Sequence, residues 1–236
     1  MPRNCDAIVV LSGGMDSATA LWWARDRGMD VASVSVNYGQ RHSCELDRAA
    51  TLAEITDTPH VCVDLTSLRS LLRGSALTDD IDVPEGHYAS PNMKVTVVPN
   101  RNMILLSVAV AAAAERSAEV VLYGAHAGDH PIYPDCRPEF VERMSSAAEV
   151  CWYEPIRIES PFLNRTKADV ARLGSELGVP WEMTWSCYCG GETHCGRCGT
   201  CVERREAFLL AGVVDPTEYI DETPVEVMMK QLEEGE

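Results

Sequence analysis

The chain has 236 residues, with 36 Asp and Glu against 20 Lys and Arg, which gives a formal net charge of −16. Hydrophobic residues make up 46% and charged residues 24% of the chain. This is the usage of a globular protein that can bury a core, and it excludes a wholly disordered chain. The acidic balance argues against a broad basic surface for duplex nucleic acid, but a local pocket could still bind a small anion.

Signals for export and for membrane insertion are not found in the sequence. No apolar run reaches the ~20 residues that a membrane-spanning helix needs. The first apolar segment runs straight into glycines, without the hydrophobic region and cleavage site of a signal peptide. We therefore expect a cytoplasmic protein with no membrane partner, in which clustered cysteines bind metal rather than form disulfides.

The hydrophobic pattern predicts an alternation of strands and helices. Strands are expected at residues 7–11, 31–36, 60–65, 119–123 and 156–158. Helices are expected at residues 16–27, 44–55, 102–116, 138–149, 167–177 and 202–210. The series predicts an α/β fold, a Rossmann-like parallel sheet with helices on both faces.

Two segments depart from this alternation. Residues 66–99 are rich in Pro, Gly and Asp, and we expect a lid or a dimer contact there. Residues 1–180 are expected to form the nucleotide-binding α/β domain. Residues 181–236 are expected to form a small zinc-binding segment with one helix and an acidic, weakly patterned tail.

A glycine-rich turn, residues 11–17 with the sequence LSGGMDS, follows the first expected strand. A helix N-terminus offers unpaired backbone N–H groups and the positive end of a dipole, so it can bind phosphate. Gly13 and Gly14 let the backbone approach the anion closely. Asp16 would repel a bare phosphate, so we expect it to cap the helix or to hold Mg²⁺.

This turn also has other interpretations. A plain strand-to-helix turn with a capping Asp or Ser would have the same local composition. The P-loop pattern GxxxxGK[ST] needs a lysine that is absent here, and the dinucleotide pattern GxGxxG is absent too.

Five of the ten cysteines fall in one short window near the end of the chain. Cys195, Cys198 and Cys201 are spaced by two residues each, and Cys187 can supply a fourth ligand. Four thiolates in a tetrahedral arrangement form a closed structural Zn²⁺ site. Cys189 lies two residues from Cys187 on an extended stretch, so both are not expected to face one ion. An iron–sulfur cluster and a redox role are the alternatives.

The Ser-Gly-Gly-x-Asp-Ser order directly after a strand resembles the pyrophosphate loop of the N-type ATP pyrophosphatases. That superfamily has the adenine nucleotide alpha hydrolase-like fold and splits ATP between its α- and β-phosphates. Three further stretches narrow the resemblance: NYGQRH at 37–42, VPNRN at 98–102 and GAHAGDHPIYPDCRP at 124–138. With the loop and the four cysteines, they make residues 7–208 similar to the 7-cyano-7-deazaguanine synthase family of the queuosine pathway.

The resemblance implies an ATP-dependent carbon–nitrogen ligase that uses Mg²⁺ and a structural Zn²⁺. The family adenylates 7-carboxy-7-deazaguanine, and ammonia then displaces AMP to give an amide. A second activation of the amide lets it lose water to the nitrile preQ0. A homodimer is also implied. The required chemistry is mostly positioning and charge neutralisation.

The resemblance also implies roles for individual residues. ATP and its Mg²⁺ should be bound by Leu11, Ser12, Gly13, Gly14, Met15, Asp16, Ser17, Asn37, Tyr38, Arg41 and Lys167. The catalytic group should comprise Asp16, Ser17, Arg101 and Lys167. The deazaguanine should be bound by Arg101, Asn102, Asp129, Tyr133, Asp135 and Arg137. The zinc ligands should be Cys187, Cys195, Cys198 and Cys201.

Guanidinium groups pair with phosphates and carboxylates, and an aspartate can accept hydrogen bonds from a guanine-like ring. We therefore expect a locally cationic pocket inside an acidic exterior, built from Arg41, Arg101, Arg137 and Lys167.

Several alternatives for the reaction stay open on sequence alone. His130-Pro131-Ile132 and Cys189 depart from the usual family pattern. They leave open which nitrogen compound accepts the activated acyl group. The enzyme could stop at the amide, or join the activated carboxylate to another amine such as a protein terminus. A tRNA base-modifying enzyme and a nucleotide sensor are further alternatives. The charge of −16 counts against the first of these, and the complete phosphate-binding set counts against the second.

Overall fold

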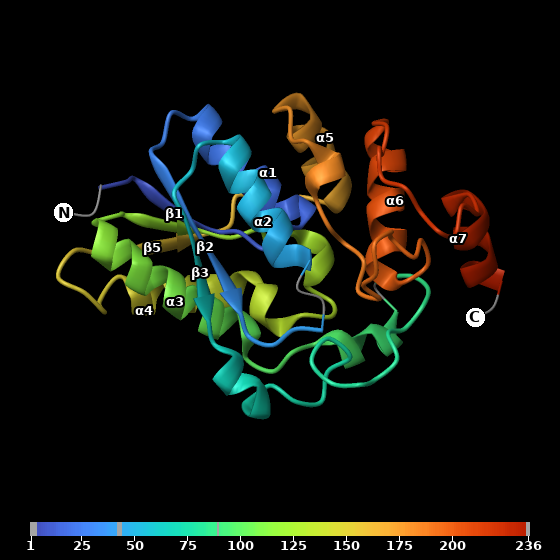
Figure 1. Cartoon of the computed structure of the whole chain (residues 1–236), viewed down its shortest axis with the longest axis horizontal. Helices are drawn as coiled ribbons and strands as arrows, with labels where there is room; N and C mark the ends of the chain where they lie inside the picture. Colours follow the sequence, from blue (N-terminus) through green and yellow to red (C-terminus); the bar gives the residue numbers. More distant parts are fainter. Residues whose placement is uncertain (1–3, 42–43, 89, 235–236) are drawn as a thin grey trace.

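A five-stranded parallel sheet forms the centre of the computed structural model, which describes residues 4–41, 44–88 and 90–234 (Figure 1). Its strands are β1 (Ala7–Val10), β2 (Val31–Asn37), β3 (His60–Asp64), β4 (Val120–Leu122) and β5 (Arg157–Glu159). They lie in the order β3-β2-β1-β4-β5, and each neighbouring pair is parallel. The predicted parallel sheet is confirmed, with every expected strand in place.

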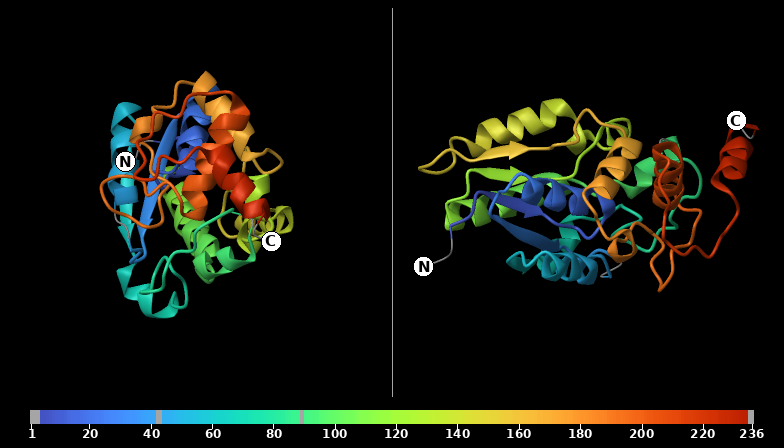
Figure 2. Two further views of the ribbon diagram at one scale, coloured as in Figure 1. Left: turned by 90° about the vertical axis from the view of Figure 1, so that its right-hand side faces the viewer. Right: turned by 90° about the horizontal axis from the view of Figure 1, so that it is seen from above.

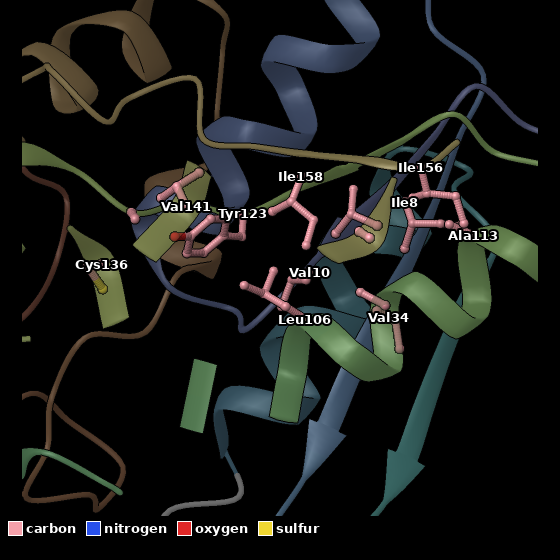
Figure 3. Packing of buried hydrophobic residues seen from close by; sticks show 14 of the residues in the cluster. Ile8, Val10, Val34, Leu106, Ala113, Tyr123, Cys136, Val141, Ile156 and Ile158 are labelled. Carbon is pink, nitrogen blue, oxygen red and sulfur yellow. The ribbon is translucent and has the colours of Figure 1, made fainter. Parts of the chain in front are cut away.

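Helices cover both faces of the sheet, as predicted. One face carries α1 (Met15–Asp26), α2 (Cys44–Ile55) and α5 (Lys167–Glu176), and the other carries α3 (Arg101–Arg116) and α4 (Pro138–Ala148) (Figure 1). Side chains alternate along a strand, so β1 supplies both cores. Val10 lies beside Leu106 of α3, as Figure 3 shows, while Val9 packs in the cluster that contains Leu21 of α1.

The order of the strands reverses beside β1. From β1 the chain builds β2 and β3 on one side, and then returns to build β4 and β5 on the other side. In open α/β sheets, ligands bind outside the carboxyl ends of the strands at such a switch point. The ends of β1 and β4 are therefore where a site is expected.

The segment 66–99 contains two short 3₁₀ helices, Thr66–Leu71 and Pro91–Thr96. It packs against the cysteine segment: Arg197 pairs with Glu85 at 2.8 Å, and Gly86 N–H donates to the Arg197 carbonyl. Its function as a lid or a dimer contact stays a prediction.

The C-terminal part contains α6 (Gly199–Ala211) and α7 (Val225–Glu234), which lie at the end of the molecule away from the N-terminus (Figure 2). Phe208 of α6 is buried and packs edge-on against Trp181 with ring centroids 5.2 Å apart. The expectation of a weakly patterned tail was wrong over α7, because Val225 and Met228 give one side of that helix an apolar pair that is buried. The division of the chain at residue 180 stays a prediction. Among the described residues, no helix is long and apolar enough to cross a membrane.

Candidate active site

A cavity of about 220 Å³ opens at the carboxyl ends of β1, β2 and β4. Its wall includes residues from stretches as far apart in sequence as the glycine-rich turn and α6. The predicted site residues that line it are Leu11, Ser12, Gly14, Met15, Asp16, Ser17, Tyr38, Arg101, Asn102, Asp129, Tyr133 and Lys167. Most of the residues singled out by sequence therefore meet in one space.

The glycine-rich turn reaches this cavity as a closed loop. Ser12 N–H donates to Ser17 Oγ at 3.1 Å, and Ser17 Oγ donates to the Gly14 carbonyl at 3.0 Å. Gly13 has a φ of +82°, and a Cβ on it would lie 2.2 Å from the Glu45 carbonyl, so only glycine fits against α2. The turn is thereby held with the N-terminus of α1 facing the cavity.

A second close approach fixes this helix terminus against β4. A Cβ on Gly124, two residues after the end of β4, would lie 2.8 Å from Asp16 Cβ and 2.9 Å from Ser17 N. The missing side chain therefore lets the first turn of α1 lie directly on the end of β4. This places Asp16 at the switch point of the sheet.

Lys167 is the centre of a buried charge network, which we call the loop arm of the cavity. It comprises Asp16, His126, Asp129, Lys167 and Glu203. Lys167 Nζ lies 2.6 Å from Asp16 Oδ2 and 3.5 Å from Glu203 Oε2. His126 is 1% exposed, and its Nε2 lies 3.2 Å from Lys167 Nζ and 3.6 Å from Asp129 Oδ1. Buried charges of both signs are thus paired inside the protein.

This network shifts the ionisation of its members. Burial lowers the pKa of Lys167, but the nearby carboxylates of Asp16, Glu203 and Asp129 outweigh it, so the net pKa shift is upward. Burial raises the pKa of Glu203, against the opposing charges of Lys167 and His126. Lys167 is therefore held as a cation, which is the state that can contact a phosphate.

A second group of cavity residues, which we call the tyrosine arm, comprises Tyr38, Glu45, Arg101, Tyr133 and Tyr188. The Arg101 guanidinium lies 5.9 Å from the centroid of the Tyr133 ring, and the hydroxyls of Tyr133 and Tyr188 are 3.5 Å apart. Burial raises the pKa of the Glu45 carboxyl to about 7, and the charge of Arg101 opposes this shift. Among the described residues, no carboxylate lies within ion-pair distance of Arg101.

Several predicted site residues lie outside the cavity wall. Arg41 donates to the backbone carbonyls of Ile81 at 2.8 Å and Ala76 at 3.4 Å, so it ties the 66–99 segment to the end of β2. Arg137 is exposed and donates to the His130 carbonyl at 2.9 Å. Their roles towards ATP and deazaguanine stay predictions.

Three other predicted residues support the wall from behind. Asn37 Oδ1 accepts from Gly39 N–H at 3.1 Å. Asp135 Oδ2 accepts from Asn102 N–H at 3.0 Å, so it fixes the start of α3. Gly13 shapes the loop through its backbone.

The charge of the cavity also differs from expectation. Only Arg101 and Lys167 of the four expected cations line it, together with the carboxylates of Asp16, Glu45, Asp129 and Glu203. The expectation of a locally cationic pocket was therefore wrong.

Some cavity residues were not singled out from the sequence. Tyr88 comes from the 66–99 segment and donates to Asp129 Oδ1 at 3.0 Å. Glu203 and Thr200 come from α6, and Tyr188 from the cysteine segment. Each lies far along the chain from the glycine-rich turn, so no local sequence pattern connected these residues with the site.

The four predicted metal ligands meet on the cysteine segment. The Sγ atoms of Cys187, Cys195, Cys198 and Cys201 all lie within 4.8 Å of one another. Those of Cys195 and Cys201 are 3.9 Å apart. A tetrahedral zinc with Zn–S bonds of ~2.3 Å requires sulfur atoms about 3.8 Å apart, so the set fits a four-coordinate metal. Cys189 is exposed and lies outside the group.

The cysteine cluster and the cavity share one helix. Cys198 is the N-cap of α6, and Cys201 lies in its first turn. Thr200 and Glu203, in the same first turns, line the cavity. The cysteine cluster therefore lies at the start of the helix that carries Glu203 to Lys167.

A parallel α/β sheet, a glycine-rich loop at its switch point and a four-cysteine metal site together define a nucleotide-binding protein of the pyrophosphate-loop class. The comparison with protein families is more specific. The model described as "Queuosine biosynthesis protein QueC" matches residues 6–212, and the chain belongs to this family.

Relatives support the same assignment over nearly the whole chain. A protein of Marinobacter nauticus is 53% identical over 212 residues, which covers 90% of this chain and 96% of the relative. One of Hahella chejuensis is 53% identical, covering 90% and 92%, and one of Pseudoalteromonas translucida is 51% identical, covering 90% and 97%. All three are named 7-cyano-7-deazaguanine synthase. The resemblance found in the sequence is thereby confirmed.

Proposed function

We propose that this chain converts 7-carboxy-7-deazaguanine and ammonia to 7-cyano-7-deazaguanine, with cleavage of ATP to AMP and pyrophosphate. Its relatives carry the name of this synthase over 90% of the chain. The observation that carries the proposal is the Ser-Gly-Gly loop at the start of α1, with Lys167 held as a cation beside it by Asp16. The backbone N–H groups of a helix N-terminus and a fixed cation are groups that bind a polyphosphate.

The reaction proceeds through two activations. In the first, a carboxylate oxygen of the substrate attacks the α-phosphorus of ATP, and pyrophosphate leaves. Ammonia then attacks the acyl carbon, AMP leaves with its bridging oxygen, and a proton is lost to give the amide. In the second, the amide oxygen attacks the α-phosphorus of another ATP and pyrophosphate leaves; the adenylated amide then loses AMP, which takes the amide oxygen, and both protons of its nitrogen to give the nitrile.

The loop arm supplies the electrostatics of both activations. The backbone N–H groups at the start of α1 and the hydroxyls of Ser12 and Ser17 would hold the phosphates. Lys167 would neutralise charge that develops on the phosphate oxygens during attack. Because Lys167 is already fixed by Asp16 and Glu203, little reorganisation is needed as the reaction proceeds.

Mg²⁺ fits the loop arm. Asp16 Oδ1 is buried and has no hydrogen-bond partner among the described residues, so this oxygen is free to coordinate Mg²⁺. Asp16 would hold the ion, which supplies further neutralisation of the pyrophosphate. The carboxylates that line the cavity make a counterion necessary for binding a polyanion.

Zn²⁺ is the metal that we propose for the four cysteines. Closed coordination by four thiolates leaves no open position for substrate, so the metal has a structural role. It would hold the first turn of α6, and with it Glu203, against Lys167.

The proposal is tested by incubating the protein with ATP, Mg²⁺, ¹⁵N-ammonium and 7-carboxy-7-deazaguanine, and weighing the purine product. A ¹⁵N-labelled nitrile with release of AMP supports it. An amide as the sole product would favour a ligase that stops one step earlier. Bound ATP without AMP release in the presence of the deazapurine would leave a nucleotide sensor.

The expected homodimer belongs to the same proposal. Trp152 and Tyr153, in the loop after α4, are 47% and 88% exposed, and such apolar groups are available for a contact between copies. Light scattering during gel filtration measures the mass: twice 25.9 kDa supports the dimer, and 25.9 kDa contradicts it.

A further inference from the structure

We propose that Glu45 is the residue that recognises the 2-amino and N1–H edge of the deazaguanine ring, with Arg101 beside it facing the 6-oxo group. This inference rests on the proposed function and names the specificity-determining residue of the same site. It assigns the ring's donors to Glu45, whereas the family resemblance implied Asp129 and Asp135 as the acceptors; Arg101 and Tyr133 of the tyrosine arm were already expected at the ring.

Glu45 is the cavity carboxylate whose oxygens are available to a ligand. Of the four carboxylates that line the cavity, Asp16 and Glu203 pair with Lys167. Asp129 accepts from the Tyr88 hydroxyl at 3.0 Å through one oxygen and from His126 N–H at 3.1 Å through the other. Glu45 has neither a hydrogen bond nor an ion pair within the part of the chain that the structure describes, which leaves out residues 42 and 43.

The position of Glu45 brings its carboxyl to the cavity. It sits in the first turn of α2, directly beside the glycine-rich loop, and its side chain faces the cavity near Arg101, Tyr38 and Tyr188. Burial disfavours the ionised form of this carboxyl, and Arg101 opposes that effect. A ligand that donates hydrogen bonds to the carboxylate would restore what burial removes.

The hydrogen-bonding edge of a guanine-like ring complements Glu45 and Arg101. A guanine-like ring presents two adjacent donors, N1–H and the 2-amino group, next to the 6-oxo acceptor. A carboxylate accepts both donors through its two oxygens, and a guanidinium donates to the oxo group. The corresponding edge of adenine has an unprotonated N1, which would face a carboxylate as acceptor against acceptor. The pair Glu45 and Arg101 therefore selects the deazaguanine rather than the adenine of ATP.

Aromatic side chains lie near these two charged groups. Tyr38, Tyr133 and Tyr188 line the cavity, and the Arg101 guanidinium lies 5.9 Å from the centroid of the Tyr133 ring. A flat heterocycle can stack on a tyrosine ring, and such stacking adds affinity without adding specificity. Asp135, the other aspartate expected to contact the ring, does not line the cavity and binds the backbone of Asn102.

The test compares two substrates in three proteins. Glu45→Gln keeps the shape of the side chain but cannot accept two donors, while Asp47→Asn removes a carboxylate from the same first turn of α2 outside the cavity. Each protein is assayed with 7-carboxy-7-deazaguanine and with its analogue that lacks the 2-amino group. The readouts are kcat and KM for both purines and KM for ATP, with thermal melting as the control for folding.

We expect the wild type and Asp47→Asn to prefer the 2-amino substrate by about 30-fold or more in kcat/KM. In Glu45→Gln the preference should fall below about threefold, mainly through KM for the purine, with KM for ATP unchanged. A Glu45→Gln protein that keeps the preference, or that loses ATP binding instead, overturns the inference. If the wild type turns over neither purine, the proposed function itself fails and the inference falls with it.

Discussion

The two arms of the cavity handle buried charge in opposite ways. In the loop arm, Lys167 is paired with Asp16 at 2.6 Å and with Glu203 at 3.5 Å. In the tyrosine arm, no ion pair joins Glu45 or Arg101 to another described residue. Charges paired within the protein are held in place before a ligand arrives, whereas buried charges without partners are unfavourable until a ligand supplies them.

On the proposals above, this difference separates the groups that position the reactants from the groups that select the purine. A polyphosphate is the same for every reaction of this class, so a fixed network of charges suits it. The purine would have to be distinguished from the adenine of ATP, and unpaired donors and acceptors would provide that discrimination. Mutations in the two arms should therefore change different measured quantities.

The largest effect is expected at Asp16. Asp16→Asn removes the partner of Lys167 and the proposed ligand of Mg²⁺, and we expect kcat to fall ~10³-fold or more. AMP release and nitrile formation measure this. Asp26→Asn, at the exposed end of α1, is the control and should keep full activity. Activity of Asp16→Asn within tenfold of wild type would show that the loop arm does not hold the reacting phosphates.

Loss of the metal should affect the whole arm through α6. Cys198→Ser removes one ligand at the N-cap of this helix, and we expect loss of bound zinc, a fall in melting temperature of about 10 °C or more, and loss of turnover. Cys189→Ser, an exposed cysteine outside the cluster, should keep one zinc per chain and normal melting. Elemental analysis and thermal melting decide the result. A zinc-free Cys198→Ser protein with unchanged melting would mean that the metal does not order α6.

A smaller effect is expected at Glu203. In Glu203→Gln, Lys167 keeps Asp16 but loses its second carboxylate, so we expect kcat to fall about 10- to 100-fold. Because Glu203 raises the pKa of Lys167, its removal should lower that pKa, and the alkaline limb of the rate profile should move to lower pH. Glu206→Gln, further along α6 and outside the cavity, is the control. An alkaline limb that stays in place would show that Glu203 acts on something other than Lys167.

The parts of the molecule that sequence reasoning predicted are local or periodic. The buried strands, the glycine-rich turn and the cysteine spacing depend on residues that are close in the chain, and all three are where they were expected. The helix α7 was not predicted, because an acidic composition masked its apolar pair Val225 and Met228.

The residues that sequence reasoning did not place depend on tertiary packing. Arg41 has a side chain that can bind phosphate, but in the structure it donates hydrogen bonds to backbone carbonyls of the 66–99 segment. Glu203 reaches Lys167 through the packing of α6, whose N-terminus carries Cys198 and Cys201 of the cysteine cluster. The charge sign of the cavity depended on Glu45, Asp129 and Glu203 together, and spacing along the chain says nothing of that sum.

The smallest and most specific effect is the pH dependence of stability at Glu45. Burial raises the pKa of this carboxyl from 4.5 to about 7 in the folded chain, against the charge of Arg101. The folded protein therefore binds more protons than the unfolded chain between these values, so the contribution of Glu45 to the free energy of unfolding falls as pH rises through this window. Glu45→Gln should consequently stabilise the ligand-free protein at pH 8 by about 3 kcal/mol and have little effect at pH 4.

Denaturant unfolding of ligand-free protein at the two pH values measures this gain. Asp47→Asn should not reproduce this stabilisation, because the substitution only removes a favourable interaction between the Asp47 carboxylate and the N-terminus of α2. If Glu45→Gln raises the free energy of unfolding by the same amount at pH 4 and pH 8, ionisation of Glu45 does not destabilise the ligand-free protein. An ionised Glu45 would then be as well accommodated as Asp16. Only the ligand selectivity would still distinguish the two arms.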